Sequence, residues 1–148
     1  MPVTMTTQHQ LTFANTALSV SEKLFNALIT AVSNKDISQA RTVTINFRDS
    51  NYSVDAGGFH PVEISFTKTE DNHCSLLYIT DFSFSRGHHP ELDRDLDFDI
   101  SNNVFFARYS GWQPIESHDA LEMYKLWEAN FLAYLEMGSF DEVKVECF

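Results

Sequence analysis

Residues 58–84 read GFHPVEISFTKTEDNHCSLLYITDFSF, two apolar runs joined by a short polar turn. In the first run Val62, Ile64 and Phe66 alternate with polar residues, and this period of two places them on one face of a strand. The second run, residues 74–84, is the most apolar of the chain. Two such runs around the turn at residues 70–72 predict a β-hairpin. We expect this hairpin to form the centre of a sheet and of the hydrophobic core.

Further strands are predicted on both sides of the hairpin in the sequence. Alternating apolar residues predict strands over residues 41–48 and 104–109, and Val143 and Val145 indicate a short last strand. The segment Gly-Trp-Gln-Pro at residues 111–114 is expected to break the strand before it, because glycine and proline interrupt regular pairing.

One more predicted strand carries an acidic face. Its apolar residues, Leu96, Phe98 and Ile100, alternate with Asp95, Asp97 and Asp99. Strand geometry places three such carboxylates in a row about 7 Å apart on the exposed face. This row is a candidate surface for binding a basic partner.

Two helices are predicted, one toward each end of the chain. The first begins near Ser19 or Ser21, where Ser19 and Glu22 fit a capping box, and ends at residues 33–36. The second runs over residues 117–137 and stops at Gly138. We expect residues 1–15 to be flexible and residues 16–148 to form a single domain. The predicted fold class is α+β, a twisted antiparallel sheet flanked by an N-terminal and a C-terminal helix.

Composition limits the classes of partner. The 148 residues carry a net charge of −11, which repels nucleic-acid phosphates, so we expect no nucleic-acid binding. The charge suits a basic protein partner or, as an alternative, an acidic mimic of DNA. Thirteen phenylalanines, many at alternating positions, predict a core filled by aromatic rings.

The compartment is inferred from the termini and the cysteines. The first residues show no secretory signal, and no window approaches the ~18 apolar residues of a membrane span. We expect a cytoplasmic protein without a membrane partner, and export by a route without a signal stays open. Cys74 and Cys147 are expected to be free thiols, with a single disulfide as the alternative.

No cofactor or metal motif is complete. A calcium loop starting at Asp95 would need glycine at its sixth position and glutamate at its twelfth, where Ile100 and Phe106 stand. His88 and His89 are adjacent, and on an extended chain their side chains point apart. We therefore predict no metal and no cofactor.

Enzymatic activity is not expected either. The chain has no Gly-x-Ser-x-Gly elbow and no phosphate-binding Gly-x-x-x-x-Gly-Lys. Tyr52, Phe59 and Trp112 are aromatic residues that would mark a binding surface if they are exposed. Three polar residues of the central stretch, His60, Glu63 and Asp81, are not explained by packing and are candidate binding residues.

Segments 57–64, 78–82 and 136–138 resemble a family of uncharacterised proteins from vibrios and related marine bacteria. The resemblance runs from about Arg41 to the C-terminus. A member encoded on a Vibrio pathogenicity island is similar in fold to the mitochondrial acidic matrix protein, which is also a complement-binding protein. The resemblance implies a twisted antiparallel sheet with terminal helices, self-association into a homo-oligomer, and protein partners that include a complement component. It carries no binding residue over to this chain.

Three functional hypotheses follow from the sequence. The first is a non-enzymatic acidic module that binds a basic or host protein through the Asp95, Asp97 and Asp99 row. The second is a small-ligand-binding protein or enzyme that uses loops 57–61 and 86–93. It requires that His60, His88, His89 and Asp81 converge on one pocket. The third is the DNA mimic, which requires carboxylates spaced like phosphates along an elongated surface.

Overall fold

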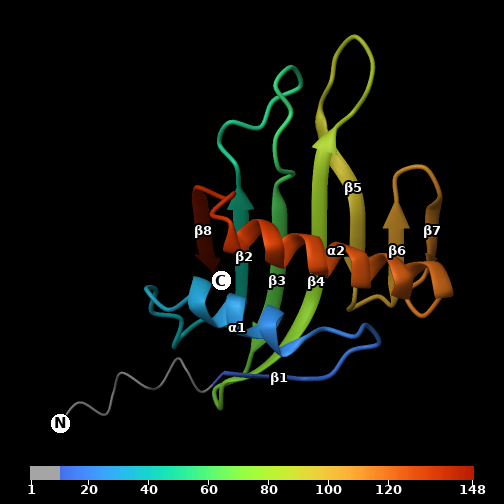
Figure 1. Ribbon diagram of the computed structural model, residues 1–148. Helices are drawn as coiled ribbons and strands as arrows, with labels where there is room; N and C mark the ends of the chain where they lie inside the picture. Colours follow the sequence, from blue (N-terminus) through green and yellow to red (C-terminus); the bar gives the residue numbers. More distant parts are fainter. Residues whose placement is uncertain (1–10) are drawn as a thin grey trace.

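The computed structural model describes residues 11–148, and two helices lie against one face of a large sheet (Figure 1). The elements are β1 (Thr12–Phe13), α1 (Glu22–Ala31), β2 (Thr42–Arg48), β3 (Val62–Lys68), β4 (His73–Phe84), β5 (Leu92–Asp99), β6 (Val104–Ala107), β7 (Gly111–Pro114), α2 (His118–Glu136) and β8 (Glu142–Cys147). The strand order is β7-β6-β5-β4-β3-β2-β8, antiparallel throughout, and β1 adds a short parallel pair to β4. The predicted α+β class, with helices over one face of an antiparallel sheet, is confirmed.

The predicted hairpin is the centre of this sheet. β3 pairs with β4 so that Ile64 lies opposite Ile79, and the turn between them holds Asn72 at a φ of 64°. Val62, Ile64 and Phe66 are all buried, as the alternation in the sequence predicts. Their side chains face α1 and α2, so the hairpin supplies the floor of the core.

The core between sheet and helices is largely aromatic. The ring of Phe98 is fully buried, stacks on Phe105 at 4.7 Å and meets the edge of Tyr124 at 5.2 Å. Further along α2, the ring of Phe131 stacks on Trp127 at 4.9 Å and contacts Phe47 at 5.1 Å. Aromatic pairs of this kind add favourable edge and stacking interactions to the burial of their area.

The helix caps correct one prediction. Ser21, not Ser19, is the N-cap of α1, and its Oγ accepts a hydrogen bond from the Leu24 backbone N–H at 3.2 Å. Glu22 therefore does not close a capping box with Ser19. The backbone N–H of Ser21 instead donates to Oε2 of Glu128 in α2 at 3.0 Å. This partly buried contact ties the start of one helix to the middle of the other, which no local pattern could indicate.

Two short strands were predicted as irregular segments. Residues 1–10 of the segment expected to be flexible lie outside the described residues, but Leu11 is buried and Thr12–Phe13 pairs with β4. Residues 111–114, expected to break the strand before them, do follow the end of β6 at Ala107, but they form a strand of their own, β7, in which Trp112 pairs with Phe106. In both places pairing with another strand supplies the hydrogen bonds that local propensity does not indicate.

The two faces of the sheet differ in polarity. Residues that alternate with the core side chains point to the face opposite the helices, here called the open face. On it, Thr44 Oγ1 lies 3.0 Å from Ser65 Oγ, and Thr80 Oγ1 donates to Asp97 at 3.0 Å. The open face is thus a polar network, whereas the helix-covered face is mainly apolar and holds the polar group described next.

Candidate functional site

A β-bulge separates the three predicted carboxylates. Asp81 pairs with Leu96 and Phe82 pairs with Arg94, so Asp95 between them has no partner in the ladder. A bulge of this kind changes the alternation of side chains. The carboxylate of Asp95 consequently lies on the helix side, 3.9 Å from Nδ1 of His60. The predicted row of Asp95, Asp97 and Asp99 on one solvated face does not exist.

Asp97 lies on the open face but is not available to a partner. Its residue is only 7% exposed, and its carboxylate accepts hydrogen bonds from Thr80 Oγ1 and from Arg94 Nη1 at 3.2 Å. Burial raises its pKa, although the bonds from Thr80 and Arg94 oppose that effect. Asp99 is half-buried and accepts hydrogen bonds from Asn102. The basic-partner hypothesis therefore loses its row of carboxylates, whereas the DNA-mimic hypothesis, which did not depend on this row, stays a prediction.

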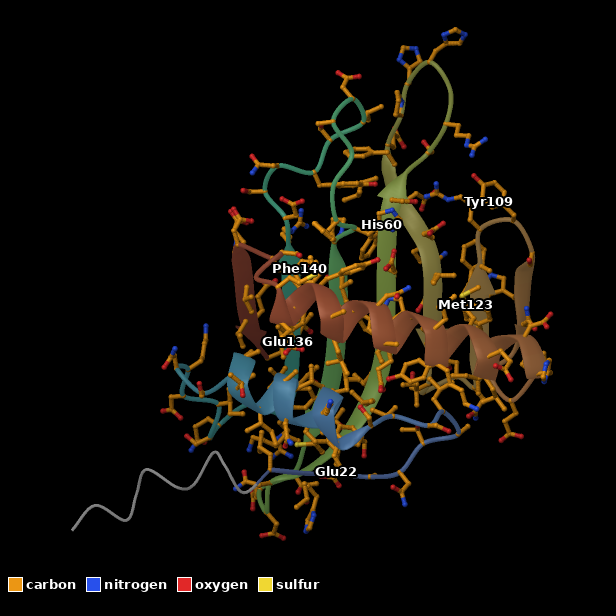
Figure 2. All side chains as sticks on the ribbon, viewed as in Figure 1. Glu22, His60, Tyr109, Met123, Glu136 and Phe140 are labelled. Atoms are coloured by element: carbon orange, nitrogen blue, oxygen red, sulfur yellow. The ribbon has the colours of Figure 1, made fainter. Side chains whose placement is uncertain are left out.

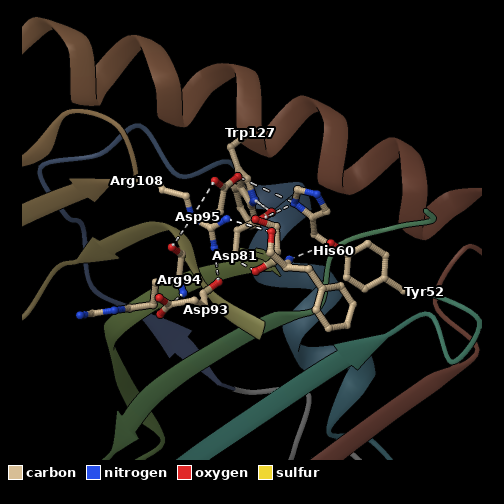
Figure 3. Close-up of polar contacts among 10 residues, drawn as sticks. Tyr52, His60, Asp81, Asp93, Arg94, Asp95, Arg108 and Trp127 are labelled. Carbon is tan, nitrogen blue, oxygen red and sulfur yellow. Dashed lines mark hydrogen bonds and ion pairs between the residues drawn. The ribbon is translucent and has the colours of Figure 1, made fainter. Parts of the chain in front are cut away.

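The polar group on the helix side is a chain of three residues (Figure 3). Nδ1 of His60 lies 2.7 Å from Oδ1 of Asp81, and Oδ2 of Asp81 accepts a hydrogen bond from Nε1 of Trp127 at 3.1 Å. Asp81 and Trp127 are buried, while the side chain of His60 is 39% exposed. One carboxylate therefore fixes both an imidazole in the loop just before β3 and an indole on α2.

The loop before β3 positions His60. The backbone N–H of Phe59 donates to Oδ2 of Asp49 at 3.1 Å, and Gly58 passes the same carboxylate at a φ of 128°. A Cβ atom at position 58 would lie 2.7 Å from that oxygen, so the close approach requires glycine. On the other side, the ring of Tyr52 lies 5.5 Å from that of His60. The imidazole is thus held from both sides.

A cavity of about 310 Å³ opens beside this group. Its polar end is formed by His60, Asp81 and Asp95. Its other walls are Gly58, Phe59, Val62, Leu96, Met123, Leu126, Trp127, Asn130, Phe131, Tyr134 and Phe140. His60, Met123 and Phe140 are labelled in Figure 2. The cavity is therefore mostly apolar and aromatic, with titratable groups gathered at one end, which is typical of a small-molecule site.

The charges at the polar end act on one another. The hydrogen bond to Asp81 raises the pKa of His60, burial opposes this, and the carboxylates of Asp81 and Asp95 add to the rise, whereas Arg108 opposes it. Arg108 lies with its Nε 3.9 Å from Oδ1 of Asp95. A histidine with a raised pKa at the mouth of a cavity is a common feature of functional sites.

The structure also brings together a donor set that the sequence did not reveal. One ligand atom each of His60, Asp81 and Asp95 lies within 4.8 Å of the others. Imidazole and carboxylate are ligands that zinc accepts. Both oxygens of Asp81 already accept hydrogen bonds, from His60 and Trp127, so a metal ion would have to displace one of them.

The remaining predicted residues lie apart from the cavity. Glu63 lies on the open face and accepts a hydrogen bond from the hydroxyl of Tyr78, whose pKa is raised to about 12 by burial and by this bond. Trp112 is 49% exposed and has the guanidinium of Arg94 5.3 Å from its ring. His88 and His89 are exposed in the loop between β4 and β5 and do not line the cavity. Of the four residues required to converge, only His60 and Asp81 do so.

Replacing His60 by glutamine is expected to make stability less dependent on pH. The folded-state pKa of His60 is raised above its ordinary value of 6.5, so its stabilising contribution is complete below that pH. The contribution is lost as the pH rises through the folded-state pKa. Urea unfolding on both sides of neutral pH should therefore show the larger wild-type advantage on the acidic side. His89→Gln, in the exposed loop, is the control for replacing a histidine that has no such contact within the described residues. If the stability of the wild type relative to His60→Gln grew with increasing pH, this assignment would be contradicted.

Comparison with known proteins places the chain among uncharacterised relatives. The model of a family described as "Protein of unknown function (DUF2787)" matches residues 21–146. A hypothetical protein from the VSP-II pathogenicity island of Vibrio cholerae superposes with a TM-score of 0.87 at 41% identity, covering 94% of this chain and 100% of that chain. No curated protein matches the chain.

A second solved structure supports the same fold. It is a conserved hypothetical protein from the VPI-2 pathogenicity island of Vibrio cholerae O1 biovar eltor, with a TM-score of 0.82 at 42% identity, covering 91% of this chain and 100% of that chain. That protein is described as sharing structural homology with the human P32 protein. The family resemblance and the fold predicted from the sequence are confirmed. Neither described helix has the length and apolarity that a membrane span requires.

Proposed function

The chain belongs to the DUF2787 family of proteins of unknown function, and we propose that it is a non-enzymatic protein that binds a small organic ligand in the cavity beneath α2. The observation that carries this proposal is the convergence of His60, Asp81 and Asp95 on one end of a cavity with aromatic walls. Apolar walls with a few convergent polar groups supply affinity and orientation respectively.

The size of the cavity limits the ligand. Its volume of about 310 Å³ suits a molecule such as one aromatic ring with a short side chain. The site is also held in place before binding, because Asp81 fixes both His60 and Trp127. A site that is ordered in advance loses little free energy to ordering when the ligand arrives.

The lining residues favour binding over a covalent reaction. Within the described residues, the cavity walls include no serine, threonine, cysteine or lysine, so nucleophiles of these four kinds are absent from them. Cys74 and Cys147 are free but lie in β4 and β8, away from the cavity, and burial raises the pKa of Cys74 to about 11. A thiol of that kind is not activated for attack.

Covering the mouth of the cavity is expected to abolish binding. Asn130 is exposed on α2 and lines the cavity, so Asn130→Trp places an indole over the opening. Calorimetric titration would measure the loss of affinity. The probes are 3-phenylpropylamine, 3-phenylpropanol and 3-phenylpropionate, which share a phenyl ring on a short chain and differ in their terminal polar group. The tightest of the three should lose about tenfold or more in affinity, which is ~1.4 kcal/mol.

Ala129→Trp is the matched control for that experiment. Ala129 is exposed on the same turn of α2 but does not line the cavity, so this variant should bind the probe like the wild type. The proposal is wrong if none of the three probes binds the wild-type protein, or if the two tryptophan variants bind equally well.

The hypothesis of a basic or host protein partner stays a prediction. The observation that favours it is the exposed Trp112 on the open face, which also carries Asp99 and Glu63, since exposed tryptophans are frequent at protein interfaces. The family resemblance adds only a shared fold, from which no partner follows. Pull-downs at low and moderate salt with Trp112→Ala and Asp99→Asn variants would show whether a bound protein uses this surface.

A further inference from the structure

We propose that the ligand is a small organic amine, whose ammonium group pairs with Asp95 while its apolar body lies against α2. This inference rests on the proposed function, because it names the chemical class of the molecule that occupies the same cavity. Three features of the cavity support an amine: the unused hydrogen-bond acceptors at its polar end, the charges there, and its aromatic walls.

Asp95 is the carboxylate with unused acceptors. Within residues 11–148 its side-chain oxygens accept no hydrogen bond, and its nearest cations are His60 and Arg108, each at 3.9 Å. Both oxygens of Asp81, in contrast, are already occupied by His60 and Trp127. An ionised carboxylate offers about four hydrogen-bond acceptor sites and no donor. The side chain of Asp95 can therefore still bind a hydrogen-bond donor or a cation.

Arg108 cannot easily fill that role. Its Nη2 donates to the carbonyl oxygens of Ser83 at 2.9 Å and Asp93 at 3.1 Å, and its Nη1 donates to Phe84 at 3.0 Å. These bonds hold the guanidinium against the backbone at the end of β4. Moving it to contact Asp95 directly would leave several carbonyl oxygens without a donor, which is costly.

The charge balance at the polar end favours a cation. Two carboxylates, Asp81 and Asp95, face a single fixed cation, Arg108, when the imidazole of His60 is neutral. One negative charge is then uncompensated at the end of an apolar cavity, where electrostatic interactions are stronger than in water. A ligand carboxylate would be repelled there, while an ammonium group would complete the balance.

The walls distinguish an organic amine from a metal ion. Phe59, Trp127 and Tyr134 present aromatic rings to the cavity, and ring faces attract organic cations. A metal ion would use only the polar end and would leave the apolar walls without a role. An amine with an apolar body uses both halves of the cavity.

Protonation of His60 should compete with the amine. The groups that face the imidazole are Asp81, Asp95, Arg108 and the ring of Tyr52. An imidazolium supplies the positive charge that the ligand would otherwise bring. Amine affinity should therefore rise as the pH increases through the pKa of His60, and the affinity of the neutral alcohol should change little.

The test compares the three phenylpropyl probes on wild-type protein and two variants. The wild type should bind 3-phenylpropylamine about tenfold or more tightly than 3-phenylpropanol, with 3-phenylpropionate weakest. Asp95→Asn should weaken the amine by about tenfold or more and leave the alcohol within about threefold. Asp99→Asn removes one carboxylate of the same strand on the open face and should leave all three affinities unchanged.

Each other outcome has a distinct meaning. If the alcohol or the carboxylate binds as tightly as the amine, the cavity is a ligand site but the amine assignment is wrong. If no probe binds, the proposed function fails and this inference with it. If Mn²⁺ or Zn²⁺ alone binds at one equivalent, is lost in Asp95→Asn and excludes the amine, the group is a metal site and the inference is overturned.

Discussion

Replacing Phe98 by alanine is expected to destabilise the protein by about 3–5 kcal/mol, the usual cost of removing a buried phenyl ring. The ring of Phe98 is fully buried between the sheet and α2. It stacks on Phe105, meets the edge of Tyr124, and lies 6.2 Å from Trp127. Its loss would leave a cavity that the rigid sheet cannot close.

Phe106→Ala is the matched control for this change. Phe106 follows Phe105 in β6, the strand that pairs with β5. Its side chain lies half-buried on the open face against Trp112. Its removal should cost about 1 kcal/mol, as is typical of partly exposed positions. Urea unfolding followed by circular dichroism measures both. Equal losses for the two variants would contradict the assignment of the core to the helix-covered face.

Replacing Asp81 by alanine is expected to have the second largest effect, about 2–3 kcal/mol of lost stability. The reason is that the substitution leaves a buried hydrogen-bond donor without an acceptor. The indole N–H of Trp127 would lose its acceptor, and the residue is only 6% exposed. His60 would lose its hydrogen-bond partner at the same time. We expect the loop before β3 to loosen and the polar end of the cavity to lose its shape.

Asp81→Asn separates the two roles of this carboxylate. Its amide oxygen can still accept from Trp127, so we expect a smaller loss of stability than with alanine. The hydrogen bond to an ionised carboxylate, which together with its charge raises the pKa of His60, is nevertheless gone, so that pKa should fall toward its ordinary value. Unfolding curves and a histidine titration by NMR measure these effects. An unchanged pKa of His60 in Asp81→Asn would show that the hydrogen bond is not its cause.

Much of the fold could be predicted because local patterns determined it. The alternation at Val62, Ile64 and Phe66 identified both the strand and its buried face, since side chains in a strand have a period of two. The end of α2 followed from Gly138, which adopts a φ of 76° that other residues rarely take. Such features depend on neighbours in the sequence, which a single sequence displays.

The positions of Asp95 and Asp97 were predicted wrongly because they depend on more than the local sequence pattern. Asp95 and Asp97 stand at alternate positions of the predicted strand, on either side of Leu96, yet the bulge directs Asp95 into the cavity while Asp97 is buried on the open face. The bulge depends on the register between β4 and β5, which the alternation within one strand does not specify. The short strands β1 and β7 were missed for the same reason.

The candidate site was half visible in the sequence. His60 and Asp81 were polar residues that packing did not explain, and they do meet. Trp127 lies within the helix predicted over residues 117–137 and was not singled out, although a buried indole N–H requires an acceptor and could have prompted the search for one. Arg108 had no distinguishing pattern, because its role arises from carbonyl groups on two other strands.

The central claim is that the cavity beneath α2 is a ligand-binding site, and the two tryptophans of the chain can test it directly. Trp127 lines the cavity, whereas Trp112 lies on the open face. In ¹⁵N-labelled protein each gives its own indole N–H resonance. Titration with 3-phenylpropylamine, and then with its alcohol and carboxylate analogues, should shift the Trp127 resonance in a saturable way and leave that of Trp112 in place. A Trp127 resonance that none of the three probes moves, or a shift confined to Trp112, would contradict the account.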